Sequence, residues 1–189
     1  MPNSEALGMI ELTSIGIGHL VQDAMLKAAE VKLLVGRSIC SGKYIIIVGG
    51  QVGPVQSSVR AGLDTAPDGI IDHITIPSIH PDVFRALGDM VQVGSGRNDQ
   101  VPSLGIVETF SAASAIEAAD AAAKAANITL FRIHIAMAMG GKGLVMMSGS
   151  VSDCRTGVEA GAALVKEKGL LVSQVVIPRP SRELFAERL

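Results

Sequence analysis

Two cysteines, Cys40 and Cys154, carry the side chains best suited to bind a metal or to react as nucleophiles. Cys40 lies in the loop 38–43, between two predicted strands, and Cys154 follows Asp153 near the start of a predicted helix. Free cysteines commonly pack as small apolar residues, which is the role we predict for Cys154.

The remaining motifs point away from an enzyme. The four histidines are scattered and lack metal-binding spacing. Five residues separate Gly36 from Gly42, whereas a phosphate-binding loop has four between its glycines. Glu11 and Glu108 recur at equivalent strand ends, and this repetition favours a structural hydrogen-bonding role over acid–base catalysis. Because no acid, base and nucleophile converge, we predict that the chain is not an enzyme.

The elements that must position these residues occur twice. Leu7–Glu11 recurs as Leu104–Glu108, and Asp23–Ala29 recurs as Asp120–Ala126. Between positions 7 and 35, ten of 29 residues are identical at an offset of 97. Later matches fall at an offset of 99, so the second copy has gained two residues near the loop that follows position 36. The sequence is therefore an internal duplication.

Each copy predicts the element order β-α-β-β-α-β, an α+β unit, from alternating and helical spacing of its apolar residues. In the first copy we expect strands at 7–12, 31–35, 44–48 and 70–76, helices at 17–28 and 52–65, and a short helix at 81–87. Residues 93–102 contain glycine, asparagine and proline and predict a linker. We therefore divide the chain into a first domain at 1–92, a linker at 93–102 and a second domain at 103–189.

Composition narrows the choice of partners. The net charge is −2 with no long basic tract, and aromatic residues make up 3% of the chain, which argues against nucleic-acid binding. Hydrophobic residues reach 48% and charged residues only 18%, which favours burial in subunit interfaces. No apolar run approaches the roughly 20 residues of a membrane helix, and the first residues form no signal peptide. We expect a cytosolic protein with reduced cysteines.

The repeated motifs resemble the shell domain of bacterial microcompartments. They are Leu-Gly-x-Ile/Val-Glu, then Asp-x-x-x-Lys-Ala-Ala, then a Gly-Lys turn, and Val-Ile-Pro-Arg-Pro at 176–180. The resemblance covers both copies and is strongest to tandem-domain, iron–sulfur members from propanediol-utilisation compartments. It implies a homotrimer that imitates a hexameric disc, surrounds a central pore, and tiles with other shell proteins around encapsulated enzymes.

The same resemblance implies a role for Cys40. In the family, the loop between the two middle strands faces the disc axis, so a trimer would bring three Cys40 thiolates together. They would bind one [4Fe–4S] cluster per trimer, with a non-protein ligand on the fourth iron, and serve electron transfer across the shell, with an encapsulated redox enzyme as a possible partner. The implied pore loops contain Ile39, Cys40, Ser41, Gly42, Met139, Gly140 and Gly141.

The resemblance also implies residues at the disc edge. Lys27 and Lys124 occupy equivalent helix positions, and Arg179 lies in the Pro-Arg-Pro turn of the second copy. The first copy has Ser78 and His80 in this region and lacks the arginine. Members of the family contact neighbouring discs through such residues, although a solvated helix face is the ordinary role of a lysine.

Two alternatives remain open at this stage. One is a shell protein with an empty or gated metabolite pore and no cluster, which differs from the first hypothesis only at Cys40. The other is a trimeric regulator or enzyme that binds small ligands between subunits, which the lack of a catalytic set disfavours.

Overall fold

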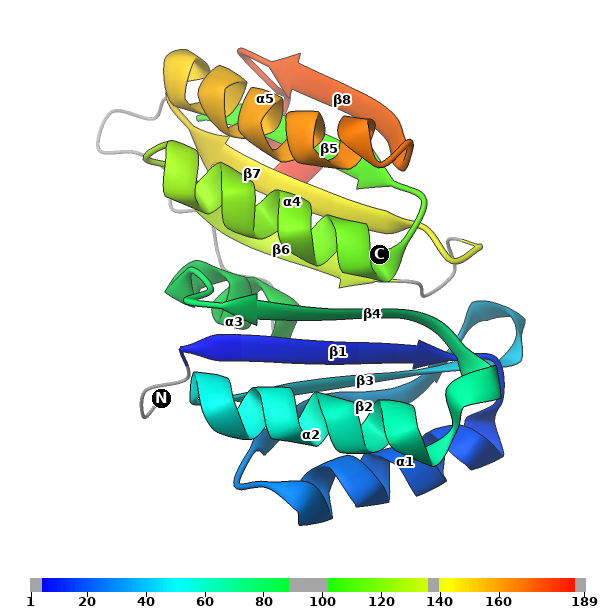
Figure 1. Ribbon diagram of the computed structural model, residues 1–189. Helices are drawn as coiled ribbons and strands as arrows, with labels where there is room; N and C mark the ends of the chain where they lie inside the picture. Colours follow the sequence, from blue (N-terminus) through cyan, green and yellow to red (C-terminus); the bar gives the residue numbers. More distant parts are fainter. Residues whose placement is uncertain (1–4, 89–101, 136–139, 186–189) are drawn as a thin grey trace. The chain divides into compact units, whose positions relative to one another are not determined.

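A computed structural model describes residues 5–88, 102–135 and 140–185, and each copy forms one antiparallel sheet with its helices (Figure 1). The first sheet has the strand order β2-β3-β1-β4. Two long helices, α1 and α2, cover one of its faces, and a short helix follows β4 (Figure 1). The elements are β1 (Ala6–Leu12), α1 (Ile15–Ala28), β2 (Lys32–Ile39), β3 (Lys43–Gly50), α2 (Val52–Thr65), β4 (Ile70–Pro77) and α3 (Pro81–Gly88).

The second copy repeats this arrangement. Its sheet has the order β6-β7-β5-β8, and helices α4 and α5 cover one face (Figure 1). The elements are β5 (Ser103–Thr109), α4 (Ala112–Ala125), β6 (Thr129–Ile135), β7 (Gly143–Gly149), α5 (Val151–Glu167) and β8 (Leu171–Ile177). The predicted order β-α-β-β-α-β is thus confirmed in both copies. The predicted linker, 93–102, lies outside the described residues apart from Pro102.

The core explains why the middle strands are so apolar. Ile10 and Leu12 of β1 and Tyr44, Ile46 and Val48 of β3 face the helices and pack in one buried cluster. The residues between them, which point to the other face of the sheet, are buried too, and all seven positions of β1 are buried. A strand buried on both faces loses the alternation of a half-exposed strand and reads as a nearly continuous apolar run.

Serine residues fix where three of the helices begin. The hydroxyl oxygens of Ser14, Ser111 and Ser150 accept hydrogen bonds from the backbone N–H three residues later, at 3.4, 3.1 and 3.0 Å. Each satisfies one of the N–H groups that a first helical turn leaves without a partner. Ser14 and Ser111 occupy equivalent positions, so the capping signal was duplicated with the fold.

The duplication extends to irregularities in the strands. The register of β2 against β3 shifts between Leu33 and Val35, and that of β6 against β7 shifts at the equivalent place, between Leu130 and Arg132. β1 and β5 each shift against their outer neighbour at the last residue of the strand. Because a bulge re-aims the chain locally, its repetition indicates that both copies retain the same strand geometry.

The loop that contains Cys40 is shorter than the sequence predicts. We expected strands at 31–35 and 44–48, whereas β2 continues to Ile39 and β3 starts at Lys43. β2 lies at the edge of the sheet, where polar residues such as Arg37 and Ser38 can continue a strand, so its polar end gave no apolar signal. Only three residues, 40–42, connect the two strands.

Candidate functional site

Cys40 lies in a tight turn between β2 and β3. Ile39 and Lys43 pair across the two strands and close the connection, which forms one turn of 3-10 helix over Cys40–Gly42. Ser41 and Gly42 both have positive φ, 65° and 73°. Cys40 is half-buried and is not in a disulfide.

An ion pair lies at the base of this turn. Lys43 Nζ donates a hydrogen bond to Glu11 Oε1 at 2.9 Å, and the Glu11 side chain is only 3% exposed. The same pair recurs in the second copy, where Lys142 Nζ lies 2.9 Å from Glu108 Oε1. The repeated glutamates therefore have the structural hydrogen-bonding role that their repetition predicted. Their lysine partners were visible in the sequence as the repeated Gly-Lys turn, although the pairing itself was not predicted.

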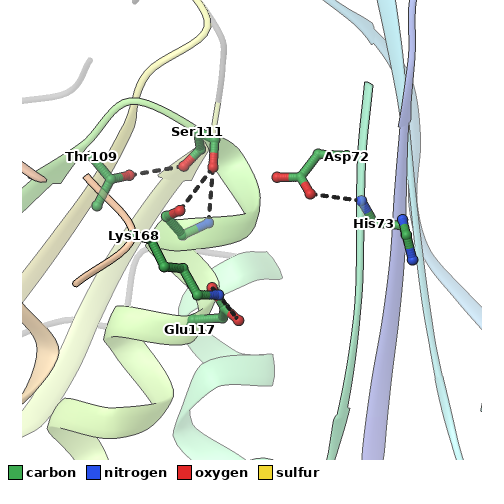
Figure 2. A network of polar contacts seen from close by, with 7 residues as sticks. Asp72, His73, Thr109, Ser111, Glu117 and Lys168 are labelled. Atoms are coloured by element: carbon green, nitrogen blue, oxygen red, sulfur yellow. Dashed lines mark hydrogen bonds and ion pairs between the residues drawn. The ribbon is translucent and has the colours of Figure 1, made fainter. Parts of the chain in front are cut away.

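The second ion pair has an additional hydrogen bond. Ser173 Oγ donates to Glu108 Oε2 at 3.0 Å, from the adjoining strand β8. The hydrogen bond from Lys142 holds the pKa of Glu108 below its ordinary value, against the opposing effect of burial. In the first copy, Asp72 pairs with Glu11 in the register where Ser173 pairs with Glu108, and its carboxylate accepts the backbone N–H of His73 at 2.8 Å (Figure 2).

Tyr44 anchors helix α1 immediately beyond the ion pair. Its hydroxyl donates to Gln22 Oε1 at 2.9 Å and lies 3.4 Å from His19 Nδ1. Burial raises the pKa of the Tyr44 phenol. Gly18 sits against the ring, because a Cβ added there would lie 2.4 Å from Tyr44 Cγ. Sequence reasoning missed this contact, and a glycine inside the first turn of an amphipathic helix was the available signal.

The second copy holds its first helix differently. Ser111 Oγ caps α4 and also contacts the Ser114 hydroxyl at 3.0 Å, while Thr109 Oγ1 donates to the Ser111 carbonyl at 2.8 Å (Figure 2). The Lys168 ammonium binds both carboxylate oxygens of Glu117, at 2.7 and 2.6 Å (Figure 2). These contacts fix α4 to its own copy, whereas Gly143 stands at the position of Tyr44.

The predicted pore loop of the second copy is only partly described. Met139 lies outside the described residues. Gly140 and Gly141 have φ values of 62° and 90°, which a glycine adopts without strain. Gly141 belongs to the same compact unit as the first sheet, and a Cβ added to it would lie 3.9 Å from Lys43 Nζ. The structure therefore brings the end of this loop beside the lysine that follows the Cys40 turn.

The three predicted edge residues are exposed, and both lysines are paired within their own helices. Lys27 Nζ lies 2.6 Å from Asp23, and Lys124 Nζ lies 2.6 Å from Asp120. Arg179 is exposed in the segment that follows β8. Each lysine is thus held by a carboxylate four residues earlier, and the contacts of all three residues with neighbouring discs stay predictions.

Cys154 has the structural role predicted for it. It is fully buried in α5, and its thiol donates a hydrogen bond to the Ser103 carbonyl at 3.4 Å. Burial, with a smaller contribution from Asp153, raises its pKa to about 11. The equivalent residue of the first copy, Val55, is also fully buried. This thiol stays protonated at neutral pH and is not available as a metal ligand.

Within the described residues of one chain, no three His, Cys, Asp or Glu side chains come close enough to hold a metal ion. In the same part of the chain, no helix has the length and apolar character to span a membrane. What the site contains is a cysteine-bearing turn fixed to its sheet by an ion pair, in one of two copies of a small α+β unit. These are features of a tandem-repeat protein.

Comparison with known proteins identifies the class. The BMC domain matches residues 6–79 and again residues 103–180. The bacterial microcompartment shell protein PduT of Citrobacter freundii is 43% identical over 97% of each chain. The carboxysome shell protein CsoS1 of Prochlorococcus marinus is 41% identical over 44% of this chain and 84% of its own length, which is one copy against one domain.

A solved structure agrees with the sequence relatives. A microcompartment protein from Desulfitobacterium hafniense has a TM-score of 0.89 and 42% identity, and covers 96% of this chain and 98% of its own. The chain therefore belongs to the BMC-domain family of bacterial microcompartment shell proteins. It is a structural shell component with two tandem domains, not an enzyme, and its place is the shell of a microcompartment.

Proposed function

We propose that this shell protein forms a homotrimeric disc whose central pore holds one [4Fe–4S] cluster, bound by three Cys40 thiolates. When bound, the cluster supplies one-electron transfer, and the disc would pass electrons across the shell to or from an encapsulated redox enzyme. The observation that carries the proposal is the placement of the half-buried Cys40 in a tight turn with positive φ at Ser41 and Gly42, whereas the second copy has positive φ at Gly140 and Gly141 but no cysteine in this segment.

The trimer is supported by a difference between the two copies. Ile17 and Leu20 are three residues apart on one side of α1 and are 40 and 54% exposed, and Ile15, at the start of the helix, is 41% exposed. At the equivalent positions of α4, Ala112 and Ser114 are buried, at 0 and 1%. In a closed ring of alternating copies every such face is covered, so the open face of α1 fits a neighbouring chain.

The cluster is supported by the chemistry of the turn. A cubane cluster has three equivalent irons around its body diagonal, and three symmetry-related thiolates match them, whereas ordinary ferredoxin sites use four. Gly42 has no neighbouring heavy atom within 4 Å of an added Cβ, so the loop has open space around it. The half-buried Cys40 thiol is thus placed differently from Cys154, which is enclosed by the core.

Anaerobic reconstitution with iron and sulfide tests the proposal. We expect about four irons per trimer rather than per chain, because three chains share one cluster. A broad brown absorbance should bleach on reduction. Cys40→Ala should abolish both signals, and Cys154→Ala, the matched control from the other copy, should retain both. Loading must be anaerobic because no protein ligand shields the fourth iron.

The same experiment decides against the alternative pore. If the native trimer takes up no iron, or if Cys40→Ala binds as much as the native chain, the cluster proposal is wrong. Cys40 would then be a pore-lining thiol, and an empty or gated metabolite pore would be the function of the disc.

A further inference from the structure

Helix α1 carries a polar cluster that the proposed iron site does not use. His19 is exposed, and the centre of its ring lies 4.7 Å from that of the Tyr44 ring. Its Nδ1 lies 3.4 Å from the Tyr44 hydroxyl oxygen, and this hydroxyl donates to Gln22 Oε1 at 2.9 Å. Because a hydroxyl has one proton to donate, the hydrogen bond with His19 requires the ring to donate from Nδ1. The other ring nitrogen, Nε2, is then a free acceptor in the neutral ring.

The second copy places apolar residues at the positions of this cluster. Ile116 stands at the position of His19 and is fully buried, and Gly143 stands at the position of Tyr44. A Cβ added to Gly143 would lie 2.5 Å from Ala115 Cβ, so helix α4 leaves no room for a larger side chain there. The first copy therefore presents an ionisable ring at a position that is apolar and enclosed in the second.

The side of α1 that carries His19 is open in the first copy and covered in the second. Ile15 lies four residues before His19, which puts the two residues on the same side of the helix, and it is 41% exposed. The equivalent residues of α4, Ala112 and Ile116, are both 0% exposed. Since the two copies share one fold, a closed ring of alternating copies would cover this side of α1 with a neighbouring chain.

We propose that His19 lies in the interface of the homotrimer and makes its assembly sensitive to acid. The inference rests on the proposed homotrimer and not on its iron–sulfur cluster. At neutral pH the uncharged ring offers Nε2 as an acceptor to the neighbouring chain. A protonated ring has no acceptor and brings a charge into an apolar interface. The separated chain therefore binds the proton more readily than the trimer does, and assembly weakens as the pH falls.

The groups around the ring leave histidine as the residue that changes charge near neutral pH. Strand β3 contributes the Tyr44 phenol. On α1 itself, Asp23 follows four residues after His19, and its carboxylate lies 2.6 Å from Lys27 Nζ. The contacts that strands β1 and β2 and helix α2 make with α1 involve uncharged residues, namely Leu12, Gly36, Ser58 and Gly62. Among these side-chain types, histidine is the one that ordinarily titrates between about pH 5 and 8.

Sedimentation velocity of the full chain, kept reduced and measured over a concentration series, tests the proposal. The native chain should be a trimer at about pH 7.5, and at about pH 5.5 the concentration at which half the chains are assembled should rise by about tenfold or more. His19→Ile, which gives the first copy the residue of the second, should assemble at the same concentration at both pH values. Since His19 is exposed on the single chain, this change should leave the fold intact, which circular dichroism checks.

His73→Gln is the matched control, because His73 is an exposed histidine on β4 of the same copy. This variant should keep the acid response of the native chain. If the native chain assembles equally well at both pH values, or if His19→Ile dissociates in acid as the native chain does, the proposal is overturned while the trimer stands. A native chain that is monomeric at neutral pH overturns the proposed trimer itself, and the role of His19 with it.

Discussion

Replacement of Gly18 by alanine tests the packing that holds α1 against the strand behind the Cys40 turn. A Cβ at this position would lie 2.4, 2.5 and 2.6 Å from three atoms of Tyr44, far inside van der Waals contact. The Tyr44 ring has little room to move, since the residue is 2% exposed and its hydroxyl is hydrogen-bonded to Gln22. Helix α1 must therefore lift from the sheet, or the tyrosine must give up its hydrogen bond.

The size of the effect follows from opposing contributions. Overpacking a buried site costs about 1–3 kcal/mol, and a lost hydrogen bond adds roughly 0.5–1.5 kcal/mol. Alanine gains about 0.5–1 kcal/mol over glycine through its helix preference. The net change should be a destabilisation of about 1–3 kcal/mol, which corresponds to several degrees in the unfolding midpoint.

Gly16 provides a control on the same helix. A Cβ at Gly16 would meet no heavy atom within 4 Å, so Gly16→Ala has the helix preference without the clash and should be neutral or slightly stabilising. Thermal unfolding of both variants is compared with the native chain at one protein concentration, because the midpoint of an oligomer depends on concentration. If Gly18→Ala melts at or above the temperature of Gly16→Ala, the close packing on Tyr44 is refuted.

Three further predictions concern assembly and pH. Ile17→Asn together with Leu20→Asn should weaken the trimer by a few kcal/mol per interface, since about half of each side chain is exposed in one chain and would be buried by its neighbour. Sedimentation should then show chains near 19.5 kDa instead of three times that mass. An unchanged trimer would mean that another face makes the interface. Lys27→Asp with Lys124→Asp should destabilise each contact between neighbouring discs by a few kcal/mol. Trimers should stay intact, while the flat layers of tiled discs should disappear from electron micrographs. Undiminished layers would contradict the assignment of these lysines to the disc edge. Glu108 has a lowered pKa in the folded state, so its contribution to the free energy of unfolding is complete above its unfolded pKa near 4.5. This contribution is lost as the pH falls through the lower pKa of the folded state. The free energy of unfolding of Glu108→Gln, measured with denaturant, should therefore depend less on acid pH than that of the native chain.

The fold was predictable because the same order of motifs occurs twice in the sequence. The repeated Leu-Gly-x-Ile/Val-Glu strand and the Asp-x-x-x-Lys-Ala-Ala helix gave the first strand and the first helix of each copy. The end of β2 was not predictable from apolar spacing. Its last residues, Arg37 and Ser38, lie at a sheet edge where polar side chains are tolerated, so no hydrophobic pattern distinguished strand from loop.

The site was predictable only in part. Cys40 stood out by residue type, and Cys154 was correctly placed in the core because it aligns with an apolar residue of the other copy. The partners Glu11 and Lys43 are 32 residues apart, and which strands lie side by side has to be known before they can be paired. The same holds for Tyr44 with Gln22. Cross-element contacts of this kind arise from sheet topology, which residue spacing alone does not encode.

Several differences between the two copies lie where a trimer would use them. The glutamate–lysine pair, the serine cap and the strand bulges are present in both copies. The cysteine, the tyrosine behind it and the apolar face of α1 occur only in the first copy. A ring of six identical domains would place a cysteine at all six loops. Duplication lowers the required symmetry to three, and three thiolates are the number that the equivalent irons of one cubane can accept. On the proposed assembly, fusing two domains is therefore what allows a pore to carry a single shared ligand set, while the other three loops remain free to take a different length and chemistry.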